Sequence, residues 1–354
     1  MEAKTPLSRK VREFWPLLIL TAGLLLIVLV IELVGDRILS QTLTEGLIRL
    51  IVVVGLFTFV GNSGLVSFGH ISFMMIGAYA AAWQTCCPMV KDIFMPGLPE
   101  YLLNNSHHWF PAIVSGGALA AVVAAITGIA LMRLSGIAAS IGTFAMFMSF
   151  YSIYLVWSTW TAGQSSLVGI PVTTTPWVAL AFAVFTMVCA FLYSRSRFGL
   201  ALRSSREDKV AAEAAGVNVL LQRWFAFVIS AFFVGMAGGL YGHFLGLISV
   251  DTFYLSLTFI TLSMLVVGGM QSLSGAVIGA VVISTLIEVL RRLESGFSVG
   301  ESVFKLPSSS AEVGLGVIML IILIFRPSGI TRNAEIYWPW KGKTTAESGT
   351  KRAS

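Results

Sequence analysis

The chain has 354 residues, of which 56% are hydrophobic and only 11% carry a charge. Soluble domains carry about 25% charged residues, so this composition excludes an ordinary water-soluble protein. The net charge of +6 suggests nucleic-acid binding at first sight. An uneven distribution of basic residues between membrane loops explains it better, so we expect no nucleic-acid partner.

Long apolar runs with few charges recur along the chain and indicate membrane-spanning helices. About 20 helical residues cross the hydrocarbon core of a bilayer. The runs are continuous rather than alternating, which favours helices over a closed β-barrel. We predict an all-α, polytopic transmembrane helical bundle of about ten spans, within a range of eight to ten. The predicted spans are 17–34, 47–60, 65–86, 109–131, 136–157, 177–193, 224–247, 253–267, 273–289 and 313–325.

The basic residues give this bundle an orientation. Most of them lie before the first span, at Arg133, in the loop 194–223 and from Arg326 onward, and fewer lie in the alternate loops, at Arg37, Lys91, Arg291, Arg292 and Lys305. Cytoplasmic loops are enriched in Lys and Arg, so we expect both termini in the cytoplasm. The predicted organisation is a cytoplasmic N-terminal segment 1–13, a transmembrane domain 14–330 and a polar cytoplasmic tail 331–354.

Two predicted spans are short and end in glycine-rich sequence. Span 47–60 contains Arg49 and runs into Gly61-Asn62-Ser63-Gly64, and span 253–267 ends at Gly268-Gly269-Met270-Gln271-Ser272. Such paired interruptions indicate either broken helices around a transport path or two tight cytoplasmic turns. Both interpretations stay open from the sequence.

Several charged residues lie in or beside apolar segments. Glu45 and Arg49 are four residues apart and suited to pairing, although we expect the Arg49 side chain to extend to the membrane surface. We expect Glu288, Arg291 and Arg292 to form a charge cluster at a helix end.

Two histidines and a series of glycines also stand out in apolar sequence. An ionisable group such as His70 or His243 in a span is a candidate for substrate contact. We favour the alternative that its hydrogen bonds are satisfied inside the protein, for His70 by Ser67. The spacing of Gly235, Gly239, Gly242 and Gly246 predicts close helix packing.

The most specific feature is the polar loop 194–223. Ser204 or Ser205 is suited to cap a helix, with Glu207 and Asp208 in its first turn. Alanine-rich sequence continues to Ala215, and Gly216 would end the helix. Val210, Ala211 and Ala214 would then form a small, smooth patch that fits a groove on a partner protein. The alternative is a helix that only connects two spans.

This loop resembles the Glu-Ala-Ala coupling loop of ABC importer permeases, in the form found in the branched-chain amino acid permease family (LivM type). The stretches 64–79, 223–243, 266–280 and 325–329 are similar to that family in order and spacing, so the resemblance covers about residues 47–330. It implies a permease domain over 14–330 and location in a bacterial inner membrane. It also implies a homologous second permease subunit, two cytoplasmic ABC ATPases and a periplasmic substrate-binding protein as partners.

The resemblance also implies functional residues. The expected ATPase-coupling residues are Arg206, Glu207, Asp208, Ala211, Ala212, Glu213, Ala214, Ala215 and Gly216. The expected translocation path lies along 61–79 and 268–279, with Gly64, Ser67, Gly69, His70, Ser72, Gly268, Gly269 and Ser272. Gly342-Lys343-Thr344 resembles the end of a phosphate loop, but Tyr337 stands where its first glycine belongs. We therefore expect no catalytic residue, metal or cofactor in this chain, with ATP and Mg²⁺ on the partner subunits.

The stretches 161–171 and 141–147 depart from the usual pattern of that family, which leaves the substrate open. The leading prediction is ATP-driven import of branched-chain or other hydrophobic amino acids by alternating access. A urea or short-chain amide importer is the alternative within the same machinery. An ion-coupled secondary transporter is a less favoured rival, and an intramembrane enzyme is disfavoured because no span holds paired carboxylates or a Ser/His dyad.

Overall fold

A computed structural model describes residues 6–295, 297–299, 302–304, 310–326, 329–332 and 334–335. Most of these residues are helical and very few are in strands, which confirms the predicted all-α class. The long helices are α1 (Pro6–Val34), α2 (Arg37–Ser63), α3 (His70–Thr85), α6 (Trp109–Leu131), α7 (Ile137–Val156), α9 (Pro176–Arg195), α12 (Val219–Leu245), α13 (Leu255–Gly268), α14 (Leu273–Ser295) and α15 (Ser310–Phe325). The short elements are α4 (Pro88–Phe94), α5 (Glu100–Asn104), α8 (Ser158–Thr161), α10 (Arg197–Glu207), α11 (Lys209–Ala214), the 3₁₀ helix η1 (Val250–Phe253) and strands β1 (Leu167–Val168), β2 (Leu247–Ile248), β3 (Phe297–Val299) and β4 (Ser302–Phe304).

Eight of the described helical segments are long and apolar enough to cross a membrane, so the chain is a polytopic membrane protein. They match the predicted spans other than 65–86 and 313–325. Helices α3 and α15 occupy those two ranges with 16 residues each, about 24 Å of helix. The total of ten spans stays a prediction.

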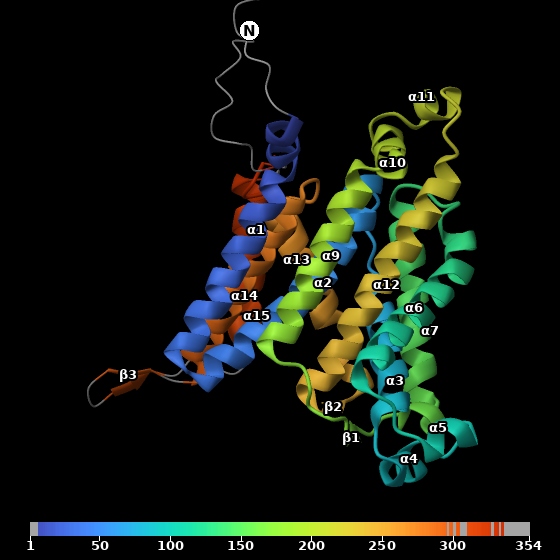
Figure 1. Cartoon of the computed structure of the whole chain (residues 1–354), viewed down its shortest axis with the longest axis vertical. Coiled ribbons are helices and arrows are strands. Elements are labelled where there is room, and N and C mark those ends of the chain that lie inside the picture. The colour runs from blue at the N-terminus through green and yellow to red at the C-terminus, as the bar shows by residue number, and fades with distance from the viewer. Residues whose placement is uncertain are drawn as a thin grey trace, which may run out of the picture.

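The helices form a bundle with different short elements at its two ends. Figure 1 shows α10 and α11 at one end, which we call the α11 end, and α4, α5, β1 and β2 at the other, the α4 end. The indole N–H of Trp224 at the start of α12 donates to the carbonyl of Ala125 at 2.8 Å. The nearby loop with Arg133 therefore lies at the α11 end, as does loop 194–223, whereas Lys91 lies on α4. This separation agrees with the predicted grouping of basic loops; which side of the membrane each end faces stays a prediction.

Helices α3, α6 and α12 form the centre of the bundle through contacts between their backbones. A Cβ atom on Gly238 of α12 would lie 1.8 Å from the carbonyl oxygen of Met74 on α3, and one on Gly235 would lie 2.6 Å from Ala120 Cβ on α6. Small residues allow this approach, which is how membrane helices gain packing energy. The predicted close packing at Gly235 and Gly239 is confirmed, whereas Gly246 caps the end of α12 with φ of 74°.

Helix α2 corrects the prediction of a short span at 47–60. It has 27 residues and begins at Arg37, where the Asp36 side chain accepts the N–H of Ile38. Arg49 therefore lies near the middle of a full-length helix. The span was predicted too short because the polar residues Thr42 and Glu45 interrupt the apolar pattern of the sequence. In the structure both side chains have hydrogen-bond partners on neighbouring helices, and α2 continues through them.

The two glycine-rich interruptions have different structures. Residues 64–69 are non-helical between α2 and α3, and α7 satisfies part of their backbone: Thr143 Oγ1 accepts the N–H of Phe68 at 3.3 Å, and Ser140 Oγ donates to the carbonyl of Val66 at 2.7 Å. Non-helical backbone at membrane depth needs such cover. By contrast, 269–272 is a tight turn between α13 and α14. The second interruption is therefore a tight turn, as one of the two interpretations predicts, whereas the first is a non-helical segment after the end of the unbroken helix α2.

The loop 161–171, where the sequence departs from the family pattern, packs against the end of α12. Strand β1 pairs with β2 in antiparallel register, with Leu167 opposite Ile248. The N–H of Ile170 donates to the carbonyl of Gly246 at 3.2 Å. Thr161 is buried and donates to the carbonyl of Tyr154 at 2.6 Å. This loop therefore has a defined structure at the α4 end.

Candidate functional site

The loop between α9 and α12 forms two helices rather than the single predicted one. Ser196 caps α10 by accepting the N–H of Gly199, and Asp208 caps α11 by accepting the N–H of Ala211 at 3.0 Å. The prediction that Ser204 or Ser205 is the cap was wrong, because both hydroxyls donate to carbonyls three residues earlier within α10. Gly216 follows the last turn with φ of 83°, so the predicted helix end is confirmed.

Helix α11 presents the predicted small, smooth surface. Val210 is 76% exposed, and Ala211 and Ala214 are exposed beside it, whereas Ala212 is buried against the protein. The Lys209 ammonium lies 3.7 Å from the Glu213 carboxylate, a weak surface ion pair. The exposed residues Val210, Ala211, Ala214, Ala215 and Gly216 form what we call the α11 surface. Their side chains are small, so another protein can approach this surface closely.

Two arginines attach α10 to the end of α2. Arg206 Nη1 donates to the carbonyl of Gly61 at 2.7 Å, and its other nitrogens hold the Glu207 carboxylate at 2.6 and 3.1 Å. Arg203 Nε donates to Asn62 Oδ1 at 2.7 Å. Burial lowers the pKa of the Arg203 guanidinium, as does the positive charge of Arg206. Both hydrogen bonds join the loop between α9 and α12 to the end of the membrane-spanning helix α2.

The first part of the predicted path lies inside the bundle. Gly64 is exposed at the end of α2, whereas Ser67, Gly69, His70 and Ser72 are buried. The Nδ1 atom of His70 lies 2.8 Å from Ser67 Oγ, as the sequence suggested, but its Nε2 atom is buried without a hydrogen-bond partner, so the expectation is met at one ring nitrogen only.

The surroundings of His70 are aromatic. Its ring centroid lies 5.3 Å from that of Phe227, 5.5 Å from Phe59 and 5.9 Å from Phe73. His243 is equally buried and contacts the Gly239 carbonyl at 2.7 Å through Nδ1. Both histidines are packed in the core, and a transport role for either stays a prediction.

The second part of the predicted path is the α13–α14 turn. A Cβ on Gly268 would lie 2.0 Å from the carbonyl of Gly275, so the two helices touch through their backbones. Gly61 meets this turn, because its own Cβ would lie 2.6 Å from the carbonyl of Met270. The structure thus brings the two predicted path regions together at the α11 end, beside Arg206.

A short segment of the predicted polar tail contacts the same turn. Thr331 donates its N–H and its hydroxyl to the carbonyl of Gly268, and its hydroxyl lies 3.3 Å from that of Ser272. The Glu335 carboxylate accepts the N–H of Leu273 at 2.8 Å and the hydroxyl of Ser274 at 2.6 Å, so it caps α14. The sequence analysis missed this cap, and Gly342-Lys343-Thr344 lies outside the described residues.

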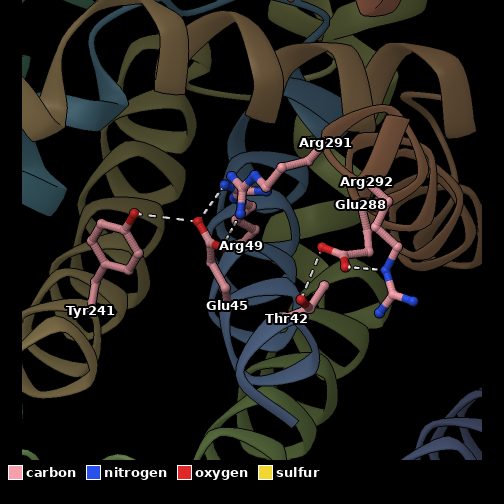
Figure 2. A network of polar contacts seen from close by, with 7 residues as sticks. All are labelled: Thr42, Glu45, Arg49, Tyr241, Glu288, Arg291 and Arg292. Carbon is pink, nitrogen blue, oxygen red and sulfur yellow. Dashed lines mark hydrogen bonds and ion pairs between the residues drawn. The ribbon is translucent and has the colours of Figure 1, made fainter. Parts of the chain in front are cut away.

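A charged cluster between α2, α12 and α14 is the main feature that sequence reasoning missed. Figure 2 shows Glu45 paired with Arg49, with Tyr241 Oη at 3.4 Å and an Arg291 nitrogen at 3.7 Å. Arg49 is only 7% exposed, so its predicted pairing is confirmed and its predicted extension to the membrane surface is wrong. The predicted charge cluster at the end of α14 is confirmed, but it extends to α2 and α12.

Glu288 joins the same cluster from α14. It accepts Arg292 Nε at 2.7 Å and the Thr42 hydroxyl at 3.0 Å, a contact between residues 246 positions apart. The i,i+4 spacings of Glu45–Arg49 and Glu288–Arg292 were the available sequence signal. They could not show that the two pairs face each other.

Two cavities adjoin the cluster. A cavity of about 660 Å³ lies between α2, α12 and α14, and is lined by Asp36, Gln41, Glu45, Phe244 and Arg291 among others. An apolar cavity of about 360 Å³ lies between α1, α2 and α14, and is lined mainly by leucine, isoleucine and valine. Within the part of the chain that the structure describes, no group of three or more His, Cys, Asp or Glu residues is arranged to hold a metal ion.

Comparison with known proteins shows to which family the chain belongs. The family model described as "Branched-chain amino acid transport system / permease component" matches residues 38–325. The chain belongs to this permease family. The match covers all membrane-spanning candidates except α1, together with α10, α11 and the charged cluster. The protein is therefore a multi-pass transport permease subunit of the ABC type.

Individual relatives agree with this assignment. The high-affinity branched-chain amino acid permease protein LivM of Escherichia coli is 24% identical over 81% of this chain and 68% of its own length. A probable LivH permease of Methanocaldococcus jannaschii is 30% identical over 40% of this chain and 42% of its own. A guanosine ABC transporter permease of Bacillus subtilis is 34% identical over 26% of this chain and 27% of its own. No solved structure matches the chain.

Proposed function

We propose that this chain is the membrane-spanning permease subunit of a bacterial ABC importer that moves branched-chain or other hydrophobic amino acids across the inner membrane. The observation that carries the proposal is the family match over residues 38–325, which includes the exposed α11 surface. The LivM and LivH relatives are named as branched-chain amino acid transport permeases, which supports this substrate class.

The partners follow from the same proposal. A homologous second permease subunit completes the membrane part, two cytoplasmic ABC ATPases bind ATP and Mg²⁺, and a periplasmic protein delivers the substrate. The α11 surface docks to an ATPase, since small exposed side chains allow a close approach in a groove. The α11 end and both termini then lie in the cytoplasm, in agreement with the basic residues gathered there.

The contacts at the α11 end suggest how ATPase movement reaches the helices. A displacement of α11 moves α10, and Arg206 and Arg203 transmit it to Gly61 and Asn62 on α2. Gly61 in turn touches the α13–α14 turn at Met270. Rigid-body movement of these helices would open the substrate path to one side and then the other, which is alternating access.

Reconstitution tests the proposal. Proteoliposomes that contain the chain with its second permease, ATPases and binding protein are expected to take up leucine or phenylalanine only when ATP is supplied. Urea and guanosine serve as substrate controls. The proposal fails if the chain alone transports these compounds on a Na⁺ or H⁺ gradient, or if the complete complex takes up urea or guanosine but no hydrophobic amino acid.

A further inference from the structure

One short segment near the end of the described chain satisfies the last carbonyl groups of α13. We call its described residues, 329–332 and 334–335, the strap. The N–H of Ile330 donates to the carbonyl of Val267 at 2.8 Å, and Thr331 donates both its N–H and its hydroxyl to the carbonyl of Gly268, at 3.2 and 2.8 Å. The last carbonyls of a helix have no partner within it, so the strap caps α13.

The same strap satisfies the first turn of α14. The Glu335 carboxylate accepts the N–H of Leu273 at 2.8 Å, the N–H of Ser274 at 3.3 Å and the hydroxyl of Ser274 at 2.6 Å. A carboxylate at a helix N-terminus also interacts favourably with the helix dipole. Both helix ends at the α13–α14 turn therefore depend on residues that lie 61 to 63 positions later in the chain.

The strap is fitted closely to the turn. Gly329 has a φ of 74°, and a Cβ atom on it would lie 2.7 Å from the Cα of Gly269, so no larger residue fits there. Arg332 also has a positive φ, of 53°, which is uncommon for a residue other than glycine. Such a conformation persists only where the surrounding contacts enforce it. Specific contacts therefore determine the shape of the strap.

The strap also lies beside α10. A Cβ atom on Gly61, where α2 ends, would lie 2.6 Å from the carbonyl of Met270 in the turn, and α10 is hydrogen-bonded to this same end of α2. Burial lowers the pKa of the Arg203 guanidinium on α10, whereas the negative charge of Glu335 acts in the opposite direction. Glu335 is therefore close enough for its charge to interact with that of Arg203 while it caps α14.

On the basis of the proposed function, we propose that the strap transmits movement of α10 to the α13–α14 turn, with Glu335 as the positioning residue between Arg203 and α14. A helix end that is capped from outside moves with the group that caps it. This connection reaches α14, whereas the bond from Arg206 to Gly61 reaches α2. Together the two connections make the helices on both sides of the turn respond to the same displacement of α11.

Hydrogen–deuterium exchange of the full chain in nanodiscs tests the strap without any transport measurement. Glu335→Gln is expected to speed exchange of the Leu273 and Ser274 amides about tenfold, because it removes a charged acceptor. Arg203→Gln is expected to speed exchange of the same amides about twofold or more, although Arg203 contacts neither. Arg203→Gln should have no further effect when Glu335→Gln is already present. Arg197→Gln, at an exposed position on α10, is the matched control and should leave both amides unchanged.

Coupling is then measured in the complete transporter in proteoliposomes. Glu335→Gln is expected to lower leucine uptake per ATP hydrolysed about fivefold or more, with the amount of bound ATPase unchanged because the α11 surface is intact. Glu100→Gln removes an exposed carboxylate from the α4 end and is the control.

Two results would overturn the inference. One is an unchanged ratio of uptake to hydrolysis in Glu335→Gln. The other is that Arg203→Gln leaves exchange at Leu273 and Ser274 unchanged, or alters it equally with and without Glu335→Gln. Absence of ATP-driven leucine uptake by the unmodified transporter would instead count against the proposed function, and the exchange measurement would still decide whether Arg203 acts on α14 through Glu335.

Discussion

The Arg206 guanidinium lies 2.7 Å from the carbonyl oxygen of Gly61, so the loop that carries α11 is hydrogen-bonded to the last turn of α2. The bond is between a charged donor and a backbone acceptor in a half-buried position, where the side chain of Arg206 is 18% exposed. Such bonds are worth about 1.5–3 kcal/mol. Together with the bond from Arg203 to Asn62, it joins α10 to α2.

Arg206→Met is expected to uncouple ATP hydrolysis from transport. The α11 surface stays intact, so ATPase association should persist, while ATP-driven uptake should fall about tenfold because α10 no longer moves α2 rigidly. Uptake and ATPase activity are measured in the same proteoliposomes. Arg197→Met, at an exposed position on α10, is the control and should change neither value. Normal uptake in Arg206→Met would exclude this link.

We expect that large side chains on the α11 surface prevent the partner from docking. Ala211→Arg and Ala214→Arg each place a long charged side chain where a partner must approach, so both the yield of co-purified ATPase and uptake should drop at least about tenfold. Ser204→Arg adds the same side chain at an exposed position on α10 and serves as control. Unchanged co-purification in both alanine variants would show that the partner docks elsewhere.

The contact between Gly238 and Met74 is expected to control stability of the bundle. Gly238→Ala introduces a Cβ that would lie 1.8 Å from a carbonyl oxygen, so α3 and α12 must separate. Overpacking of this kind costs about 1–3 kcal/mol and should lower the midpoint of thermal unfolding in detergent. Gly23→Ala in α1 has no atom within 4 Å of the new Cβ and should leave the midpoint unchanged or raise it. Equal midpoints for both variants would contradict the close packing.

Thr143 is expected to stabilise the non-helical segment before α3. Thr143→Val keeps the side-chain shape but removes the acceptor of the Phe68 N–H, so the variant should lose about 1–3 kcal/mol of stability and exchange this amide faster. Hydrogen–deuterium exchange over residues 64–69 measures the effect. Thr127→Val loses only a bond to its own helix, at Val123, and should leave the exchange of this segment as it is. Equal protection of the Phe68 amide in the unmodified protein, Thr143→Val and Thr127→Val would show that Thr143 does not stabilise this segment.

Local sequence was enough to predict most helices and the helix end at Gly216. It misplaced the caps of the coupling loop because Ser204, Ser205 and Asp208 are all good capping residues, and only the course of α10 determines which one caps a helix. It predicted too short a helix for α2 for a related reason. Hydrophobicity along the chain treats Thr42 and Glu45 as exposed, but partners on α12 and α14 satisfy them.

The sequence by itself determined the membrane class, the apolar helices and the family resemblance, because each depends on residues close together in the chain. The tertiary structure decided which polar residues meet. Glu45 and Glu288 are separate i,i+4 pairs in the sequence, and they line one cavity only because α2 and α14 lie side by side. The α11 surface was likewise predictable from its alanines. Its attachment through Arg206 to Gly61, 145 residues earlier, depends on packing between helices that no local pattern encodes.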